Sequence, residues 1–131
     1  IVQSQSGTGK TTVFCLGALQ VVDFTSCEPQ ALLISPTREL AEQSAKVCSA
    51  LGDYLGVKIH KCLGGKNVKE GMKILRGGVH IVSGTPGRVL SMIQQKHLEV
   101  KRIKMLVLDE ADEMFTKGFK EQVYSIHRRL P

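Results

Sequence analysis

Hydrophobic residues change their spacing along the chain in a way that predicts strands and helices in alternation. Apolar runs typical of buried parallel strands, together with one alternating segment, predict strands at 1–2, 31–35, 57–63, 79–84 and 103–109. Apolar residues at helical spacing between these runs predict helices at 10–22, 37–55, 67–75, 86–95 and 118–130. The alternation favours an α/β fold, with a parallel sheet covered by helices on both faces.

The helix expected at 37–55 has a clear amphipathic pattern. Its apolar positions are Leu40, Val47, Leu51 and Leu55, with Ala41 and Ala45 as small positions beside them. Because residues three and four apart share one face of a helix, we expect this set to face the core.

Length and composition are those of one globular domain at most. The chain has 131 residues, of which 42% are hydrophobic and 23% are charged. No apolar run approaches the ~20 residues that a membrane span needs, and no basic segment precedes an apolar one as in a secretory leader. We therefore expect an intracellular protein with no membrane partner.

The four cysteines, Cys15, Cys27, Cys48 and Cys62, are irregularly spaced. They form no Cys-x-x-Cys pair and have no histidine at the spacing of a metal ligand. We therefore expect buried, reduced thiols and neither a disulfide framework nor a zinc site.

The net charge of +6 is unevenly distributed. Residues 1–57 carry more acidic than basic side chains, so the excess positive charge lies in residues 58–131. A basic half is what a polyanionic partner requires, but a solvated lysine surface has the same composition. Charge alone leaves both interpretations open.

The segment QSQSGTGKTT at 3–12 fits the phosphate-binding loop, with Ser4 where the pattern has glycine or alanine. Its glycines let successive backbone N–H groups face an anion, and the following helix adds its positive dipole end. Lys10 can then reach the outer phosphates, and the Thr11 hydroxyl can bind Mg²⁺. A plain strand-to-helix turn is the alternative, which the Lys-Thr pair and the apolar helix argue against.

Two further polar clusters follow expected strands, where ligands gather in α/β folds. Thr37 before Arg38, and Thr85 before Pro86, have the features of helix N-caps. Each cluster therefore offers a helix N-terminus with an arginine beside it, which suits a phosphate. Ordinary caps with surface arginines are the alternative, and it weakens when two such sites share the edge that carries the phosphate loop.

The segment VLDEAD at 107–112 places carboxylates after the last expected strand. Asp109 stands where the Mg²⁺ of a bound nucleotide is normally held. Glu110 is placed to accept a proton from a water that attacks the terminal phosphate. Together with the phosphate loop, these residues predict a site of nucleoside triphosphate hydrolysis.

These motifs, in this order, resemble the first RecA-like domain of the DEAD-box RNA helicases. The matching segments are SQSGTGKT, SPTRELA, the Gly-Gly pair at 64–65, TPGR and DEAD. Within this family, ALGDYLGVKIHKCLGGKNV and the region from 103 to 126 are similar to the eukaryotic initiation factor 4A subgroup, including its exon-junction paralogue. The resemblance implies a phosphate-loop fold, ATP and Mg²⁺ as cofactors, and RNA-stimulated ATP hydrolysis.

The resemblance also implies a role for each matching residue. The residues that would bind ATP phosphates are Ser6, Gly7, Thr8, Gly9, Lys10 and Thr11. Thr11 and Asp109 would hold Mg²⁺, partly through water, and catalysis would depend on Lys10, Asp109 and Glu110. Asp112 would couple this domain to the second one. The residues that would contact the RNA backbone are Pro36, Thr37, Arg38, Gly65, Thr85, Gly87 and Arg88.

The partners implied are single-stranded RNA or a short RNA duplex, with translation-initiation or exon-junction proteins, in the cytoplasm or nucleus. Backbone contacts imply affinity with little sequence preference. An RNA clamp of the exon-junction type, locked by ATP binding, is the alternative to an unwinding enzyme. A GTPase or small-molecule kinase is a further alternative, although no Asn-Lys-x-Asp segment for reading guanine is present.

The family pattern extends beyond both ends of this chain. An adenine-reading aromatic and glutamine precede the phosphate loop, and a Ser-Ala-Thr motif and a second RecA-like domain follow. Residues 1–131 are therefore expected to form a partial domain that is inactive alone. The family topology inserts the Ser-Ala-Thr strand beside the phosphate-loop strand, so we expect the strands at 1–3 and 103–109 not to be neighbours.

Overall fold

The computed structural model describes residues 2–4, 8–63 and 68–131, with the backbone alone for 2–4, 8 and 68. In chain order the elements are β1 Val2–Ser4, α1 Thr8–Val21, β2 Ala31–Ile34, α2 Arg38–Leu51, the 3-10 helix η1 Asp53–Leu55, β3 Ile59–Cys62, α3 Val68–Arg76, β4 Ile81–Gly84, α4 Pro86–Gln94, β5 Met105–Asp109, α5 Ala111–Thr116 and α6 Lys120–Arg128. The strand-helix alternation predicted from the hydrophobic pattern is confirmed. The short helix α5 was not predicted.

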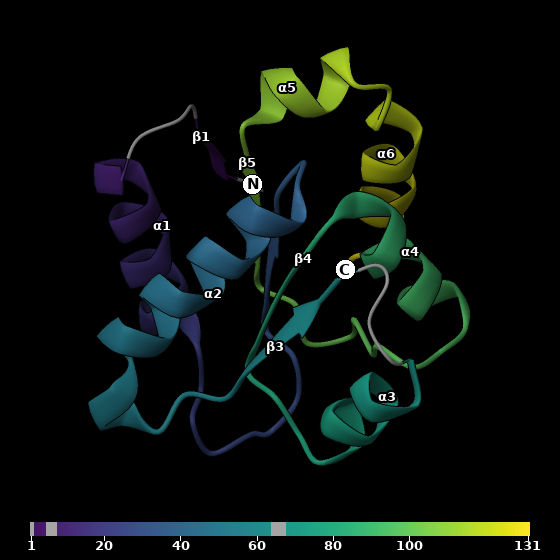
Figure 1. Ribbon diagram of the computed structural model, residues 1–131. Helices are drawn as coiled ribbons and strands as arrows, with labels where there is room; N and C mark the ends of the chain where they lie inside the picture. Colours follow the sequence, from purple (N-terminus) through teal and green to yellow (C-terminus); the bar gives the residue numbers. More distant parts are fainter. Residues whose placement is uncertain (1, 5–7, 64–67) are drawn as a thin grey trace.

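Within the described residues, five parallel strands form one sheet in the order β1-β5-β2-β4-β3 (Figure 1). In the register of the sheet, Ile34 of β2 lies opposite Leu108 of β5 and Gly84 of β4. The carboxyl ends of these three strands therefore meet at one edge. The predicted α/β class with a parallel sheet is confirmed.

The core lies on both faces of the sheet, because strand side chains alternate between them. Leu33 of β2 packs with the helix α1 residues Phe14 and Ala18 on one face. Its neighbours Leu32 and Ile34 pack on the other face, with residues of α4, α5 and α6. Figure 1 shows α1 and α2 on one side of the sheet and α4 and α6 on the other.

Helix α2 buries the predicted small positions Ala41 and Ala45, but not the leucines expected at its C-terminal end. Its buried residues are Ala41, Ser44, Ala45 and Cys48. Leu51 and Leu55 are exposed instead, and Leu55 already belongs to η1. Small side chains on the inner face let α2 approach the sheet closely, so the larger leucines lie outside that contact. The predicted stripe was wrong in this part because helical spacing does not show which face touches the sheet.

Strands β1 and β5 are direct neighbours, and Val2 pairs with Val107 in their register. The expectation that another strand would separate them is wrong for this structure. Strand β5 is bonded to β2 along one edge, and the backbone groups along its other edge also need partners when buried. Among the described residues, β1 supplies them.

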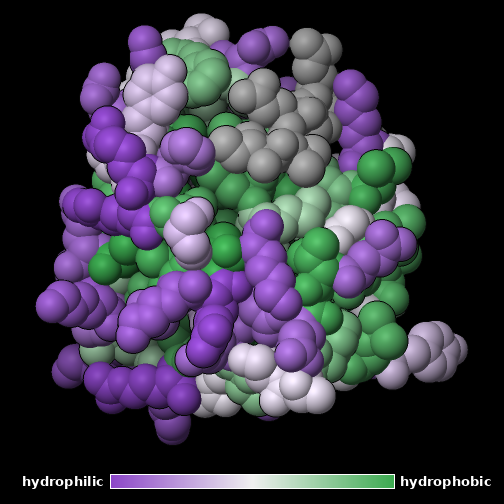
Figure 2. Space-filling model, turned by 180° about the vertical axis from the view of Figure 1, so that it is seen from behind, coloured by the Kyte–Doolittle hydropathy of each residue, from purple (hydrophilic) through white to green (hydrophobic). Residues whose placement is uncertain are grey.

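Helix α1 carries apolar residues on its outer face as well as on its inner one. Val13 is 69% exposed and Leu16 is 44% exposed. In Figure 2, which views the molecule from behind, hydrophobic surface gathers on the side where α1 lies. No helix in the described part of the chain is long and apolar enough to cross a membrane.

The predictions that the cysteines are all reduced and all buried are both wrong. Cys15 of α1 and Cys48 of α2 form a disulfide bond, and Cys27 is exposed. Cys62 is buried and reduced, as predicted. The spacing of cysteines along the chain could not reveal the pair, because it forms only when α1 and α2 pack against each other.

Candidate functional site

The predicted site residues lie around the carboxyl edge of the sheet. Ser4, the last residue of β1, pairs in register with Asp109, the last residue of β5. The segments that lead from β2 into α2 and from β4 into α4 begin at the same edge. One rim therefore collects the start of the phosphate loop, the DEAD segment and two helix N-termini (Figure 1).

Helix α1 begins at Thr8, inside the segment 3–12 that is predicted to bind phosphate. Ser6 and Gly7 lie outside the described residues, as does the side chain of Thr8. Lys10 is exposed, whereas the Thr11 side chain is buried at 8% exposure. A solvent-facing lysine followed by a buried hydroxyl in the first turn fits the division of roles predicted for phosphate and Mg²⁺.

Asp109 is buried, with 5% of its surface exposed. Burial raises the pKa of its carboxyl to about 6, and the charge of Glu110 adds to the rise, while a backbone hydrogen bond from Glu110 opposes it. An isolated buried carboxylate is costly unless a cation or hydrogen bonds compensate its charge. A bound cation would therefore stabilise the ionised form of the Asp109 carboxyl.

The described residues do not build a complete metal site by themselves. No group of three or more His, Cys, Asp or Glu side chains in the described ranges is arranged to hold a metal ion. Mg²⁺ in nucleotide sites is usually held by one or two protein groups together with substrate phosphates. Asp109 and Thr11 fit that kind of shared site, in which the nucleotide brings the remaining ligands.

Glu110 has a left-handed backbone, with φ 56° and ψ 49°, at the N-cap of α5. Residues other than glycine adopt this conformation at a cost of about 1–2 kcal/mol. Such strain clusters at functional sites, where surrounding structure holds a side chain in a required direction. The sequence contained no signal for it, because glutamate has no preference for this conformation.

The N-terminus of α2 carries the predicted Thr37 cap. Its backbone is extended, and its hydroxyl oxygen accepts a 3.2 Å hydrogen bond from the Leu40 N–H. Arg38 is exposed in the first turn, and Pro36 is buried before it. The capping prediction is confirmed, and Arg38 lies where its guanidinium is accessible to an anion.

The N-terminus of α4 differs from the prediction in two details. Thr85 occupies the N-cap, but its side chain makes no capping hydrogen bond. Arg88 is half-buried, and its Nε donates a 3.2 Å hydrogen bond to the Leu63 carbonyl after β3. A cavity of about 420 Å³ lies beside Arg88. Arg88 is thus held against the end of β3, a contact that only the folded chain could show.

Gly9 and Gly87 occupy the same position in two helices, the second residue of α1 and of α4. A Cβ atom added to either would meet nothing within 4 Å. Packing against the described residues does not require glycine there, although glycine costs about 0.5–1 kcal/mol inside a helix relative to alanine. Open backbone at a helix N-terminus is what an approaching phosphate needs.

Two predicted residues remain, Gly65 and Asp112. Gly65 falls outside the described residues. Asp112 is exposed on α5, where its carbonyl accepts a 2.9 Å hydrogen bond from the Thr116 hydroxyl. Sequence reasoning also overlooked Ser35 at the same edge, whose fully buried hydroxyl makes no hydrogen bond with a described residue.

Comparison with known proteins finds similarity over the whole chain. The family model described as "DEAD/DEAH box helicase" matches residues 1–131. Eukaryotic initiation factor 4A-1 of Arabidopsis thaliana is 58% identical over all 131 residues, which make up 32% of its length. The ATP-dependent RNA helicase FAL1 of Candida albicans is 57% identical, again over the whole chain and 33% of its own length.

Solved structures show the same relationship. A DEAD box protein from Methanococcus jannaschii superposes with a TM-score of 0.92 at 36% identity, covering 99% of this chain and 36% of that one. Dbp5 of S. cerevisiae, bound to Gle1 and IP6, gives a TM-score of 0.84 at 33% identity, with 99% and 33% covered.

The chain spans about a third of the length of the curated relatives it matches. The match nevertheless runs from its first residue to its last, and the fold and the motifs agree with it. The chain belongs to the DEAD/DEAH box helicase family.

Proposed function

We propose that this chain supplies the ATP-binding and RNA-backbone-binding part of an ATP-dependent RNA helicase of the initiation factor 4A type. The observation that carries the proposal is the single rim on which the Ser4–Asp109 pair and the N-termini of α2 and α4 converge. Nucleotide chemistry and RNA contacts at one rim can influence each other directly. The matched relatives whose names state an activity are described as helicases or as an initiation factor.

The phosphate groups of ATP would bind at the N-terminus of α1. Backbone N–H groups from Ser6 to Thr11 would face the phosphates, and the exposed Lys10 ammonium would approach the outermost ones. The open space around Gly9 supports this placement, because no part of the described chain occupies it. Thr11 and Asp109 would hold Mg²⁺, partly through water.

Hydrolysis would require a base for the attacking water. Bound Mg²⁺ supplies charge neutralisation at the phosphates. Glu110 would accept the proton from the water, because it is less buried than the metal-binding Asp109 beside it and has a left-handed backbone of its own. Keeping two adjacent carboxylates in two environments allows one to bind metal while the other acts as base. Asp112, exposed on the next helix, would couple this part to the second RecA-like domain.

RNA would bind through its backbone at the N-termini of α2 and α4. The residues proposed for these contacts are Pro36, Thr37, Arg38, Thr85, Gly87 and Arg88, with Gly65 outside the described residues. Contacts of helix N-termini and arginines with backbone phosphates carry no information about the bases, so the affinity would depend little on sequence. Single-stranded RNA or a short RNA duplex is the ligand proposed.

The cellular setting of this proposal is the cytoplasm or nucleus, with other proteins as regulators. Solved structures contain Dbp5 bound to Gle1 and to Nup159, so one relative assembles with partner proteins. Translation-initiation proteins are the partner class that we propose here, because the most similar relatives named above include an initiation factor.

RNA-stimulated ATP hydrolysis and duplex unwinding by the full-length protein would test this function. The variant Asp109→Asn removes the metal-binding charge with little change in shape. The control Asp53→Asn changes an exposed carboxylate in η1, beyond the C-terminal end of α2. We expect Asp109→Asn to lose both activities and Asp53→Asn to keep them. Equal activity in the two variants would contradict the proposed site.

A further inference from the structure

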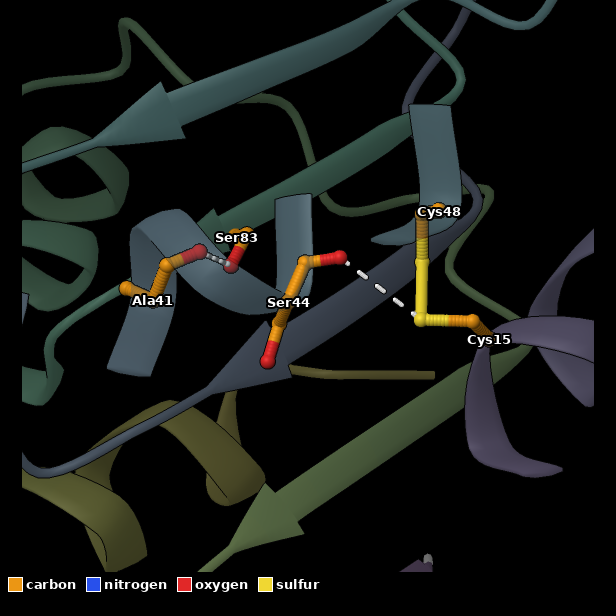
Figure 3. The surroundings of a disulfide bond; sticks show 5 residues. All are labelled: Cys15, Ala41, Ser44, Cys48 and Ser83. Carbon is orange, nitrogen blue, oxygen red and sulfur yellow. Dashed lines mark hydrogen bonds between the residues drawn. A yellow bond between two sulfur atoms is a disulfide. The ribbon is translucent and has the colours of Figure 1, made fainter. Parts of the chain in front are cut away.

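Two of the helices that begin at the rim, α1 and α2, are linked by the disulfide between Cys15 and Cys48 (Figure 3). Their Cα atoms are 5.2 Å apart, although 33 residues separate them in the chain. Both side chains are completely buried in the cluster that contains Phe14, Ala18 and Leu33. The link therefore lies inside the core between α1 and α2.

The position of Cys15 connects the link to the proposed phosphate site. Cys15 follows Thr11 by four residues in α1, so the two side chains lie on the same face, one turn apart. Both are buried. Fixing Cys15 therefore restrains the first turn of α1, where Gly9, Lys10 and Thr11 are placed.

The other end of the link is held to the sheet. The Ser83 hydroxyl of β4 donates a buried 2.8 Å hydrogen bond to the carbonyl of Ala41 in α2 (Figure 3). Cys48 lies two turns further along the same buried face of α2. The disulfide thus ties α1 to a helix that is itself anchored to the central strands.

The same packing also accommodates the two reduced thiols. The Cys15 sulfur is 3.6 Å from the Ser44 carbonyl oxygen (Figure 3). A disulfide sulfur has no proton to donate, so this contact becomes a hydrogen bond only when Cys15 is a thiol. A reduced Cys48 would be a small apolar group in an apolar cluster. Neither redox state leaves a buried polar group without a partner.

We propose that Cys15 and Cys48 are a reversible redox couple that controls how firmly the phosphate-binding end of α1 is held. The oxidant would be a low-molecular-weight disulfide of the oxidised glutathione class. One cysteine thiolate attacks that disulfide, forms a mixed disulfide and releases one small thiol. The second cysteine then attacks the mixed disulfide and releases the other. Two cysteine protons pass to the two released thiolates, and two electrons pass to the small disulfide.

Exchange at this pair requires a local opening, because both sulfurs are buried. The remaining two cysteines do not replace either partner. Burial raises the pKa of Cys62 to about 12, so its thiol stays protonated. Cys27 is exposed in the loop between α1 and β2, outside the cluster that holds the pair.

The effect on nucleotide binding rests on the proposed function. In the oxidised form, α1 is fixed against α2, and its first turn, with Lys10 and Thr11, is held ready for the ligand. If the reduced form keeps this turn ready only about a tenth to a third of the time, the Kd for nucleotide rises about 3–10-fold. Oxidation therefore favours nucleotide binding.

The test uses the full-length protein equilibrated with oxidised or reduced glutathione. Peptide mass spectrometry should find Cys15 linked to Cys48 only in the oxidised form. Without nucleotide, the oxidised form should unfold about 5–10 °C higher, because the cross-link restricts the unfolded chain. Its Kd for ADP·Mg²⁺, measured by calorimetry, should be about 3–10-fold lower than that of the reduced form.

Two variants make the test specific. Cys48→Val, which preserves an apolar side chain of similar size, should remove the response of both the midpoint and the Kd to glutathione. Cys27→Ser, at an exposed thiol, should keep both responses. If Cys48→Val fails to fold, Cys15→Ala makes the same comparison from the other helix.

Three outcomes would decide against the proposal. The couple is refuted if no Cys15–Cys48 peptide forms under oxidised glutathione. Control of binding is refuted if the linked form and the reduced form bind ADP·Mg²⁺ equally well. If neither form binds ADP·Mg²⁺, the proposed function fails together with the nucleotide effect, and the linked peptide and the midpoint alone decide whether the couple exists.

Discussion

Ser4 lies directly opposite Asp109 in the register of strands β1 and β5. Neighbouring strands are about 4.8 Å apart, so the residue that enters the phosphate loop is one strand spacing from the first carboxylate of the DEAD segment. More than a hundred residues of chain separate the two. This pairing is what turns two separate sequence motifs into one candidate site.

Replacing Lys10 by alanine should remove nucleotide binding and leave the fold intact. The Lys10 side chain is exposed and contributes nothing to the core, so the thermal midpoint should stay within about 2 °C of wild type. At about 100 times the Kd, ADP·Mg²⁺ should stabilise the wild-type protein by about 2.7 kcal/mol and raise its midpoint. The variant should show no such rise in thermal unfolding. Lys46→Ala, an exposed lysine on α2, is the control and should respond as wild type does. A full nucleotide response in Lys10→Ala would refute the phosphate-loop assignment.

Glu110→Gln in the full-length protein should slow ATP hydrolysis by about 10²–10⁴-fold, the usual contribution of a general base. Glutamine keeps the shape of the side chain but cannot accept the proton. ATP binding should persist, and the complex with RNA should dissociate more slowly, as measured by competition with unlabelled RNA. Glu113→Gln, which breaks the exposed 2.9 Å ion pair with Lys117, should leave the rate unchanged. Loss of ATP binding in Glu110→Gln would show instead that Glu110 organises the metal site.

Replacing either arginine of the rim by alanine should weaken RNA binding to the same extent. The two substitutions should affect stability differently. Arg38→Ala and Arg88→Ala should each reduce the affinity for unrelated single strands equally, and each should lower the log–log salt slope by about 0.7. Arg88→Ala should also lower the free energy of unfolding by about 1 kcal/mol, because its hydrogen bond to Leu63 is lost.

Filter binding over a range of salt concentrations and denaturant unfolding would measure these two effects. Arg38 is exposed, so its substitution should change stability by less than about 0.5 kcal/mol. A loss of affinity that differs between RNA sequences would mean that these arginines read bases.

Asp109 should make the stability of the nucleotide-free protein fall as the pH rises from about 4 to about 7. Its pKa is about 6 in the folded protein, above the ordinary value of 3.8. The unfolded chain therefore releases this proton first, and the stabilisation present below pH 4 is lost as the pH passes through 6. Relative to wild type, Asp109→Asn should gain about 1–3 kcal/mol between pH 4 and pH 7 in denaturant unfolding. Parallel pH profiles for the two proteins would show that Asp109 ionises normally.

The order and type of most elements were predictable from the amino-acid sequence, because hydrophobic spacing and capping residues act over a few neighbouring positions. The buried run Ala31–Ile34, the Thr37 cap and the proline at the start of α4 were all predictable for this reason. The motifs could also be assigned to phosphate and metal chemistry, since each motif is a short continuous segment.

Which distant segments meet became known only from the folded chain. The pairing of β1 with β5, the Cys15–Cys48 disulfide and the hydrogen bond from Arg88 to the Leu63 carbonyl each join residues separated by 25 or more positions. The left-handed backbone of Glu110 and the small buried face of α2 also depend on packing that no local pattern records. Contacts between remote residues are set by how whole helices and strands fit together, and a local sequence pattern contains no measure of that fit.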